Sequence, residues 1–529
     1  MLIMRLLLIF YLLVVCMFLF PQEMGASSYY ASPTANSNGI GTVDSPYLFA
    51  TAISKLFAGD TLWVRGGTYS SSTRYSITKS GSATDLIHIF AYTGEQPLFD
   101  FRTQAYSSNN QGFSVSGSYL EIKGLIIQAA GDNGMYVTGS YDVIENCVFR
   151  WNCDSGLQLK TGTNNLVKNC DSYENFDYKS VNSDGSPNYG GNADGFADKQ
   201  YTNSSGVNTF VGCRSWRNAD DGWDHYAKVG NTIDQNCWCY NMGPTQFDMT
   251  YHPRYATDAT YLNNFKQFDG TIIVPNYGNG NGFKTGGNYT ANNITLTNCL
   301  SANNKVKGFD QNNNNGVITI YNCSSYGNNP NYGFTNSNYG TLIIKNSISL
   351  DGLSSDRFNC KSTTSAYNTW NSGFSCSDNY FQSIDANQMI SSRQQDGSLP
   401  EISFMHLSGN SNLIDVGTDV GLPYSGSAPD LGFFEYSKTT PVNNLSVNKT
   451  FKVFPNPVID KIILEFEGNT NENVHIMLLN VTGTPVKTFI VAAVPGHNSF
   501  SFDCSNLPRG NYLCKISGSK ENEVVKLIR

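Results

Sequence analysis

Short runs of apolar residues, separated by Gly and Asn, recur along most of the chain about every 24 residues. One anchor of the repeat is an Asn-Cys pair or a close variant: Asn146-Cys147, Asn169-Cys170, Gly212-Cys213, Asn236-Cys237, Asn298-Cys299, Asn322-Cys323 and Asn346-Ser347. The other is Gly followed by a large apolar residue: Gly134-Met135, Gly156-Leu157, Gly195-Phe196, Gly222-Trp223, Gly282-Phe283, Gly308-Phe309 and Gly333-Phe334. A fixed period of short strands and tight turns predicts an all-β solenoid, here a right-handed parallel β-helix.

The anchors also predict what fills the interior. Like positions of successive coils stack ~4.8 Å apart, so Asn side chains form hydrogen-bonded ladders along the axis and small Cys and Ser side chains fit the narrow core. Twelve of the 13 cysteines lie beyond residue 26, an even number that would also suit disulfides in an exported chain. Their regular spacing favours free buried thiols over disulfides.

The first residues are typical of an export signal. Residues 2–20 are almost entirely apolar, with Arg5 near the start. That length would suit a membrane helix, but its place after the first Met and the small residues up to Ala26 favour cleavage after Ala26. Cys16 follows Val15, which disfavours a lipid anchor. We therefore assign residues 1–26 to a signal peptide and expect no membrane span in the mature protein.

Segments without the repeat flank it on both sides. Residues 27–110 are expected to form a cap with a short helix around Tyr47–Phe57, because an open solenoid end exposes unpaired strand edges. Residues 400–436 are expected to close the other end. The polar segment 437–450 is typical of a linker, which leaves residues 451–529 as a second domain.

Composition narrows the class of protein. Charged residues make up 14% of the chain and aromatic residues 13%, which excludes a coiled coil, a helical bundle and a disordered chain. The formal net charge of -8 excludes a broad nucleic-acid-binding surface. If the ligand is itself acidic, positive charge must be supplied locally. We expect an extracellular monomer rich in β structure.

Two consecutive coils carry carboxylates beside the Gly-aromatic anchors. The motifs are GGNADGFADK (190–199) and NADDGWD (218–224), and aligning the coils on the aromatic residue brings together Asp194, Asp220, Asp221 and Asp224. Carboxylates at such short range repel one another unless a cation bridges them. Ca²⁺ suits them because it takes several carboxylates and backbone carbonyls, whereas Zn²⁺ favours Cys or His. The alternative is that these residues only build turns.

Lys284 falls in the same column as Asp224 when the coils are aligned on their aromatic residues. A lone lysine is more often a salt-bridged surface residue. The chain lengthens just before both anchors, however, by insertions that end near Gly195 and Gly282. Long loops on a rigid scaffold commonly carry binding and catalysis. We therefore expect the insertions to wall a cleft around the acids and Lys284.

The C-terminal segment has a different pattern. It begins with FPNP (454–457), continues with alternating strands such as Lys461–Phe466, and ends with a Gly510-Asn511-Tyr512 hairpin and a short basic tail. It resembles the C-terminal sorting domain of the type IX secretion system of Bacteroidetes-type bacteria. The resemblance implies a small β-sandwich that directs export through the outer membrane, with the protein released or attached to the cell surface. A small binding β-sandwich is the alternative.

The motifs NADGFADK, NADDGWD, NGFKTGG and KGFDQN, with the cap and the APDLG segment, resemble the β-helical pectate lyases of polysaccharide lyase family 9 over residues 27–436. The resemblance implies that Lys284 is the base, and that Lys199 and Lys307 are candidate substrate-binding residues. It also implies a Ca²⁺ site made by four carboxylates and one backbone carbonyl: Asp194, Asp220, Asp221, Gly222 and Asp224. The chain departs from the family pattern in the distance of 60 residues from Asp224 to Lys284. One coil with a large insertion explains this distance.

That resemblance implies a Ca²⁺-dependent lyase acting on polygalacturonate, an acidic polysaccharide of the plant cell wall. Removing the uronate C5 proton builds negative charge on the adjacent carboxylate, which Ca²⁺ neutralises, and the glycosidic oxygen at C4 is then eliminated. An alkaline optimum is expected because a lysine base must be neutral. Three other classes stay open: a lyase for another uronan or a C5-epimerase, a Ca²⁺-binding adhesin without activity, and a paired-carboxylate hydrolase.

Overall fold

The computed structural model describes residues 26–202, 205–436 and 451–529, the last with gaps at 455–457, 459, 469–470, 481–484, 509 and 518–521. The predicted signal peptide, apart from its last residue, and the predicted linker lie outside the described residues. The chain forms two compact units, divided near residue 437. Within the described residues, no helix is long and apolar enough to cross a membrane.

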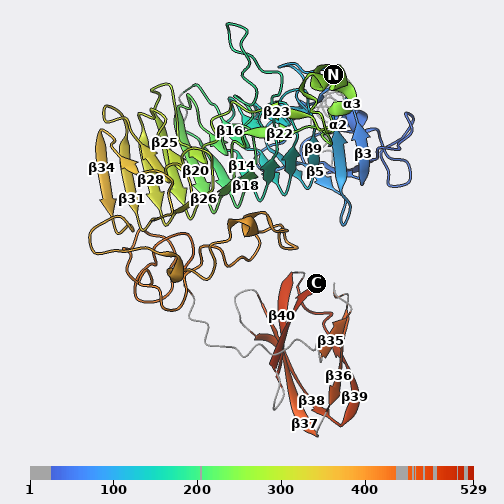
Figure 1. Cartoon of the computed structure of the whole chain (residues 1–529). Helices are drawn as coiled ribbons and strands as arrows, with labels where there is room; N and C mark the ends of the chain where they lie inside the picture. The colour runs from blue at the N-terminus through green and yellow to red at the C-terminus, as the bar shows by residue number, and fades with distance from the viewer. Residues whose placement is uncertain are drawn as a thin grey trace, which may run out of the picture. The chain divides into compact units, whose positions relative to one another are not determined.

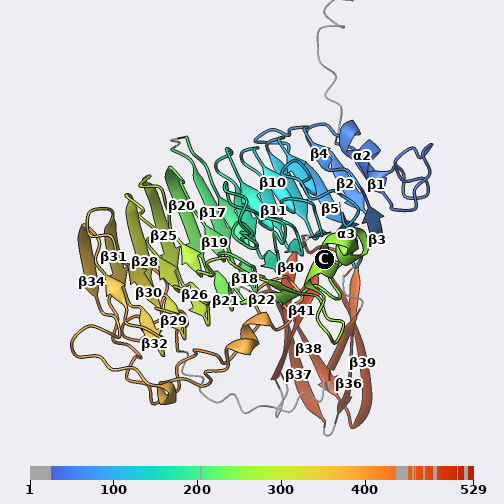
Figure 2. The same cartoon turned by 45° about the horizontal axis from the view of Figure 1, so that its top comes forward.

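The first unit is a solenoid whose coils each add one strand to up to three parallel sheets (Figure 1, Figure 2). Sheet 1 has 12 strands: β1 (Ser28–Ala31), β2 (Thr61–Val64), β5 (Ile87–Ala91), β8 (Leu120–Lys123), β11 (Val143–Glu145), β14 (Leu166–Lys168), β17 (Val207–Val211), β20 (Gly230–Gln235), β25 (Asn292–Thr297), β28 (Val317–Tyr321), β31 (Thr341–Lys345) and β34 (Ser362–Ala366). Sheet 2 has 10: β4 (Tyr75–Ile77), β7 (Phe113–Val115), β10 (Met135–Val137), β13 (Leu157–Leu159), β16 (Phe196–Asp198), β19 (Trp223–Asp224), β24 (Phe283–Lys284), β27 (Phe309–Asp310), β30 (Tyr332–Phe334) and β33 (Arg357–Phe358). Sheet 3 also has 10: β3 (Gly67–Ser70), β6 (Pro97–Asp100), β9 (Ile126–Gln128), β12 (Val148–Arg150), β15 (Asp171–Tyr173), β18 (Arg214–Trp216), β21 (Trp238–Tyr240), β26 (Leu300–Ala302), β29 (Ser324–Tyr326) and β32 (Ile348–Leu350). The predicted parallel β-helix is confirmed.

A column of aromatic side chains runs through the core behind sheet 2. Its central members pair in register, with ring centroids 4.7 to 5.1 Å apart: Phe196, Trp223, Phe283 and Phe309. The next member is Tyr332, 5.1 Å from Phe309, and Gly333 pairs with Asp310. The predicted alignment on Gly333-Phe334 is therefore wrong by two residues, because Tyr332 already fills the interior position.

The cysteines of the Asn-Cys anchors form a second buried column, in the turns that lead into sheet 3. They come from six successive coils and are fully buried: Cys147, Cys170, Cys213, Cys237, Cys299 and Cys323. All twelve cysteines of the described residues are free. The prediction of free thiols is confirmed, and that of burial holds for all but Cys360 and Cys376, which are partly exposed.

Asn recurs at two positions of the coil with different functions. The Asn of each Asn-Cys anchor takes a left-handed backbone, as at Asn146 and Asn169 with φ of 53° and 52°, a region that Asn tolerates better than most residues. The ladder predicted along the axis is made by the second position. Asn152 donates to Asn175 at 2.9 Å, and Asn175 donates to Asn218 at 2.8 Å. These bonds satisfy amides that would otherwise be buried without partners.

Aromatic side chains cover both ends of the solenoid. Helix α2 (Phe49–Lys55) lies in the predicted N-terminal cap and packs Phe49 edge-on against Phe99, with centroids 4.7 Å apart. The predicted helix was two residues longer at each end. At the far end, Trp370 stacks on Phe358 of the last coil at 4.5 Å.

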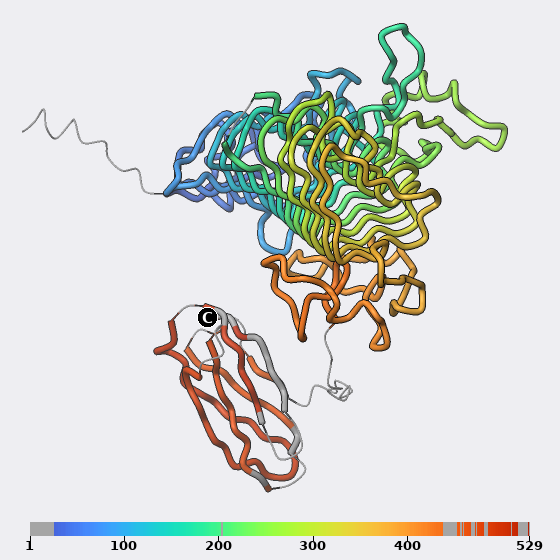
Figure 3. The backbone as a smooth tube through the Cα atoms, turned by 90° about the vertical axis from the view of Figure 1, so that its left-hand side faces the viewer, coloured from blue at the N-terminus to red at the C-terminus, as the bar shows by residue number. Residues whose placement is uncertain are grey.

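The prediction that residues 400–436 close the far end is wrong. Residues 374–436, here called the flank segment, run back along the outside of sheet 3 and include the 3₁₀ helices η2 (Asp378–Tyr380) and η3 (Ala386–Ile390). Figure 3 looks at the far end and shows the flank segment beside the coils. It buries apolar side chains of sheet 3 such as Trp238 and Leu300. The physical reason is that the outer face of sheet 3 carries apolar side chains that are stabilised by burial, whereas Trp370 already covers the last coil.

Two insertions leave the solenoid between sheet 3 and sheet 2, as predicted. The first, residues 174–195, precedes β16. The second, residues 241–282, precedes β24 and holds a two-stranded antiparallel sheet and two short helices: β22 (Gln246–Asp248), α3 (Tyr255–Leu262), η1 (Asn263–Phe265) and β23 (Ile273–Pro275). Phe176 of the first stacks on Phe247 of the second, with centroids 4.3 Å apart. The insertions therefore support each other beside sheet 2.

The second unit is a β-sandwich of two antiparallel sheets, as predicted. One sheet holds three strands: β35 (Phe451–Phe454), β36 (Lys461–Gly468) and β39 (Gly496–Asp503). The other holds four: β38 (Pro485–Ala493), β37 (Glu472–Leu479), β40 (Asn511–Ser517) and β41 (Asn522–Ile528). Its core joins Ile462 and Leu464 of one sheet to Ile476 and Ile516 of the other.

Candidate active site

Candidate site residues occupy equivalent outward-facing positions on neighbouring strands of sheet 2. The register pairs Asp224 with Ala197 on one side and with Lys284 on the other, and Lys284 with Asp310. Because the aromatic residue before each of them points into the core, strand alternation turns these side chains outward. The predicted neighbourhood of Lys284 and Asp224 is therefore confirmed, although 60 residues separate them along the chain.

Three of the four predicted acids converge in the turns that lead into sheet 2. Carboxylate oxygens of Asp194, Asp220 and Asp221 all lie within 4.8 Å of one another, and the side chains are buried. The second insertion fixes two of them. The Asn279 backbone N–H donates to Asp220 at 2.6 Å, and Asn281 donates to Asp221 from its backbone at 2.9 Å and its side-chain amide at 2.8 Å. The second insertion thus orients the carboxylates of Asp220 and Asp221 through direct hydrogen bonds.

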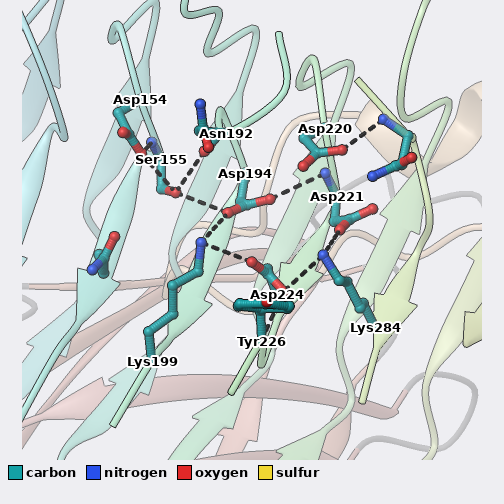
Figure 4. A network of polar contacts seen from close by, with 12 residues as sticks. Asp154, Ser155, Asn192, Asp194, Lys199, Asp220, Asp221, Asp224, Tyr226 and Lys284 are labelled. Carbon is teal, nitrogen blue, oxygen red and sulfur yellow. Dashed lines mark hydrogen bonds and ion pairs between the residues drawn. The ribbon is translucent and has the colours of Figure 1, made fainter. Parts of the chain in front are cut away.

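Asp224, the fourth acid, lies between two lysines (Figure 4). Its Oδ2 is 2.7 Å from Lys199 Nζ and its Oδ1 is 3.2 Å from Lys284 Nζ. Lys199 also pairs with Asp194 at 3.1 Å, and Lys284 with Asp221 at 2.9 Å. When all of them are ionised, the four carboxylates and two ammonium groups carry a net charge of -2, which is the charge that a divalent cation would offset.

Burial and mutual repulsion change the proton affinity of these groups. Burial raises the pKa of Asp194 to about 7 and that of Asp220 well above its usual value. Burial acts in the same direction on Asp224, but Lys199 and Lys284 outweigh it and hold the pKa of Asp224 below its usual value. Burial lowers the pKa of Lys284, yet the surrounding carboxylates outweigh it and raise that pKa well above the usual value. The cluster therefore attracts positive charge strongly, either protons or a cation.

The donor set fits a hard divalent cation. The converging trio offers only carboxylate oxygens, the ligands that Ca²⁺ prefers. Asp224 is not part of that trio, since its oxygens face the two lysines. The carbonyl oxygen of Gly222 accepts the N–H of Phe196 at 3.0 Å, which leaves its second lone pair for another partner. Ligation by Asp224 and Gly222 stays a prediction.

The two lysines predicted to bind substrate have different surroundings. Lys199 belongs to the acid cluster, where it bridges Asp194 and Asp224. Lys307 lies one coil beyond Lys284 and pairs with Asp310 at 2.8 Å. Both ammonium groups are neutralised by carboxylates, so their contact with a substrate stays a prediction.

Two hydrogen-bond donors of the site were missed by the sequence reasoning. The Ser155 hydroxyl donates to Asp194 at 3.0 Å, and Asn281 donates twice to Asp221. Ser155 and Asn281 occupy the column that Asp194 and Asp221 share, two residues before the aromatic anchor. The signal was therefore present in the alignment, because stacked positions of neighbouring coils come within hydrogen-bonding reach.

Tyr226 was missed as well. Its backbone N–H donates to Asp224 at 2.9 Å, and its ring centre lies 5.5 Å from Lys284 Nζ. The ring occupies space that Gly287 leaves open, because a Cβ added to Gly287 would lie 2.5 Å from the ring. No pattern along the chain connects these residues, so only the structure reveals the contact.

The chain is similar to known proteins along most of its length. A family profile described as "Pel9A-like, right handed beta helix region" matches residues 29–347, and one described as "Secretion system C-terminal sorting domain" matches residues 452–529. The protein named Pectate lyase L of Dickeya chrysanthemi is 34% identical over 420 residues, which cover 77% of this chain and 90% of that protein.

A protein of the same name from Paenibacillus polymyxa is 31% identical over 420 residues, which cover 75% of this chain and 85% of that protein. The crystal structure of pectate lyase Pel9A matches with a TM-score of 0.65 and 33% identity, over 78% of this chain and 97% of that one. The chain therefore belongs to the Pel9A-like, right-handed β-helix family of polysaccharide lyase family 9, and it ends in a secretion-system sorting domain.

Proposed function

We propose that this chain is a Ca²⁺-dependent pectate lyase that cleaves polygalacturonate by β-elimination, with Lys284 as the base. One observation carries the proposal: Lys284 Nζ lies 2.9 Å from Asp221, whose carboxylate is within 4.8 Å of those of Asp194 and Asp220. Similarity to proteins named pectate lyase supports the substrate class.

The proposed Ca²⁺ ligands are buried carboxylates and one backbone carbonyl: Asp194, Asp220, Asp221, Asp224 and Gly222. Bound there, Ca²⁺ would neutralise the substrate carboxylate and stabilise the negative charge that develops when the C5 proton leaves. Asn281 and Ser155 keep two of the carboxylates oriented through the hydrogen bonds described above. Hydrogen bonds of this kind orient a ligand before the cation binds.

Lys284 takes the C5 proton at Nζ in this proposal. Its side chain is 11% exposed, lies on the outer face of sheet 2 and contacts Asp221 and Asp224. Without a cation, the carboxylates hold the proton on Lys284. Once their charge is neutralised, the pKa of Lys284 falls and the amine accepts a proton at alkaline pH. The electron pair of the C5–H bond then forms a C4–C5 double bond, the bond between C4 and the glycosidic oxygen breaks, and that oxygen takes a proton from water.

The experiment is an ultraviolet assay of the full-length protein on polygalacturonate, with Ca²⁺ or with EDTA. We expect absorbance from the unsaturated uronate, loss of that signal in EDTA, and recovery when Ca²⁺ is added back. New reducing ends without absorbance would identify a hydrolase, binding without cleavage an adhesin, and inversion at C5 without cleavage an epimerase. Absorbance that EDTA leaves unchanged would refute the role of Ca²⁺.

We infer that residues 27–436 are the catalytic domain and that residues 451–529 serve export, after removal of residues 1–26 and with 437–450 as a linker. The match of residues 452–529 to a sorting domain supports this division. The enzyme is then secreted by the type IX system, and it acts on its substrate either free or at the cell surface.

A further inference from the structure

Lys160 lies near the acid cluster and, among the described residues, pairs with no carboxylate. The lysines already described, Lys199, Lys284 and Lys307, each pair with an Asp at 3.2 Å or less. Lys160 directly follows β13, and the register of β13 with β16 puts it level with Lys199 in the next coil. In the described part of the chain, Lys160 forms no ion pair, and its Nζ lies 3.9 Å from the ring centre of Tyr201.

Tyr201 is half exposed, at 50%, so its ring is open to a ligand. It follows β16, the strand between those of Lys160 and Asp224. The contact with its ring holds the ammonium of Lys160 in one place at the surface. An exposed aromatic ring beside an unpaired cation is a combination suited to a sugar ring that carries a carboxylate, because the ring covers apolar C–H groups and the cation binds the charge.

One column of sheet 2 runs along the axis from Asp224 to the coil of Lys160. The positions in register with Asp224 are Ala197 and then Gln158, which is the second residue before Lys160. Both are uncharged and buried, so sheet 2 places no carboxylate in this column between Asp224 and Lys160. The column spans two coils, or ~10 Å. A polymer lying along the axis over Asp224 therefore passes Lys160.

We propose that Lys160 and Tyr201 form a binding subsite for the acidic polysaccharide, two coils to the N-terminal side of Asp224. Lys160 binds the carboxylate of a uronate unit that is not itself cleaved, and Tyr201 packs against its ring. The subsite rests on the proposed function, since it takes the same substrate. It supplies the local positive charge that a protein of net charge -8 needs to hold a polyanion.

The test begins with Lys160→Met in the full-length protein, which removes the charge and keeps much of the side-chain length. On polygalacturonate, KM should rise about 5- to 20-fold while kcat changes by less than about twofold. The rise should be smaller on the shortest oligogalacturonide that is cleaved, because fewer of its bound units extend to Lys160. Tyr201→Ala should raise KM in the same way.

Two further variants separate charge from structure. Lys160→Arg should restore KM to within about twofold of wild type, because a guanidinium keeps the charge and stacks on the ring. The KM of Lys160→Met should also respond less to ionic strength than that of wild type. Lys79→Met is the matched control, since Lys79 likewise lies over an aromatic ring, 5.1 Å from that of Phe57, but in the N-terminal cap. Its KM should not change.

The possible failures are distinguishable. An active wild type with an unchanged polymer KM in Lys160→Met would overturn the subsite and leave the lyase proposal standing. Absence of cleavage by wild type would overturn the lyase proposal. In that case, retardation of wild type and Lys160→Met in gels containing polygalacturonate tests the subsite alone. Equal retardation would overturn it, and weaker retardation of Lys160→Met would support it.

Discussion

Replacing Lys284 by Ala tests the proposed base most directly. The change removes the proton acceptor and leaves the four acids, the outer face of sheet 2 and both insertions in place. We expect kcat to fall by ~10² to 10⁴ with little change in KM, because a group that acts only in the transition state is lost. Lys284→Arg should not rescue kcat, since arginine stays protonated at any usable pH.

The ion pairs of Lys284 give a second, independent expectation. Its ammonium is close to Asp221 and Asp224, at 2.9 and 3.2 Å, and its side chain is 11% exposed. Removing one partner of a buried ion pair costs ~3–5 kcal/mol. For a unit of about 410 residues, with ~2.1 cal/mol/K of unfolding entropy per residue, this lowers Tm by ~4–6 °C. The loss should appear in EDTA and largely disappear in Ca²⁺, which replaces the missing positive charge.

The assay combines ultraviolet rates at saturating polygalacturonate and Ca²⁺ with thermal unfolding in Ca²⁺ and in EDTA. If Lys284→Ala keeps more than about a tenth of the wild-type kcat, the expected loss for a general base is absent, and the base must be another group such as Lys199 or Lys307. If kcat falls but Tm in EDTA does not change, the ion pairs described for Lys284 do not stabilise the protein.

Three further predictions concern the metal, pH and the terminal unit. Asp221→Ala should lose activity and require at least about tenfold more Ca²⁺, as measured by activity against the concentration of free Ca²⁺. An unchanged Ca²⁺ requirement would refute the proposed metal site. Burial raises the pKa of Asp194 to about 7, so protons compete with Ca²⁺ for this carboxylate below that pH. Half-maximal activity should therefore need more Ca²⁺ at about pH 6 than at about pH 8. A Ca²⁺ requirement that does not change with pH would contradict this prediction. A chain that ends at Glu435 should keep full specific activity on soluble polygalacturonate, whereas a large loss would show that residues 451–529 help to bind substrate.

Features that follow the coil period could be predicted from the sequence. Every coil must refill the same interior, so the Gly-aromatic anchors align coils however long the loops between them become. That is why Asp224 and Lys284 could be paired across an insertion of unknown shape. The same alignment failed at Gly333-Phe334, because Tyr332 supplies an equivalent interior ring two residues before Phe334 and the local pattern offers two registers.

Features that depend on side-chain reach or on non-repeating segments could not be predicted. Residues 400–436 lack the coil period, and no pattern in their sequence indicates which face of the solenoid they cover. Lys199 was placed near the acids, but its bridging of Asp194 and Asp224 depends on rotamers that the alignment does not specify. Tyr226 needed the open space above Gly287, which is a contact between coils and not a pattern along the chain.

The flank segment also bears on how the protein folds. Each coil stacks on the one before it, so the solenoid can assemble coil by coil from its N-terminal end. The outer face of sheet 3, with Trp238 and Leu300, stays uncovered until residues 374–436 have been made. Arg393 then binds Asp171, which was translated 222 residues earlier, at 2.7 Å. A chain that has formed its last coil but has not yet docked residues 374–436 is therefore an aggregation-prone intermediate.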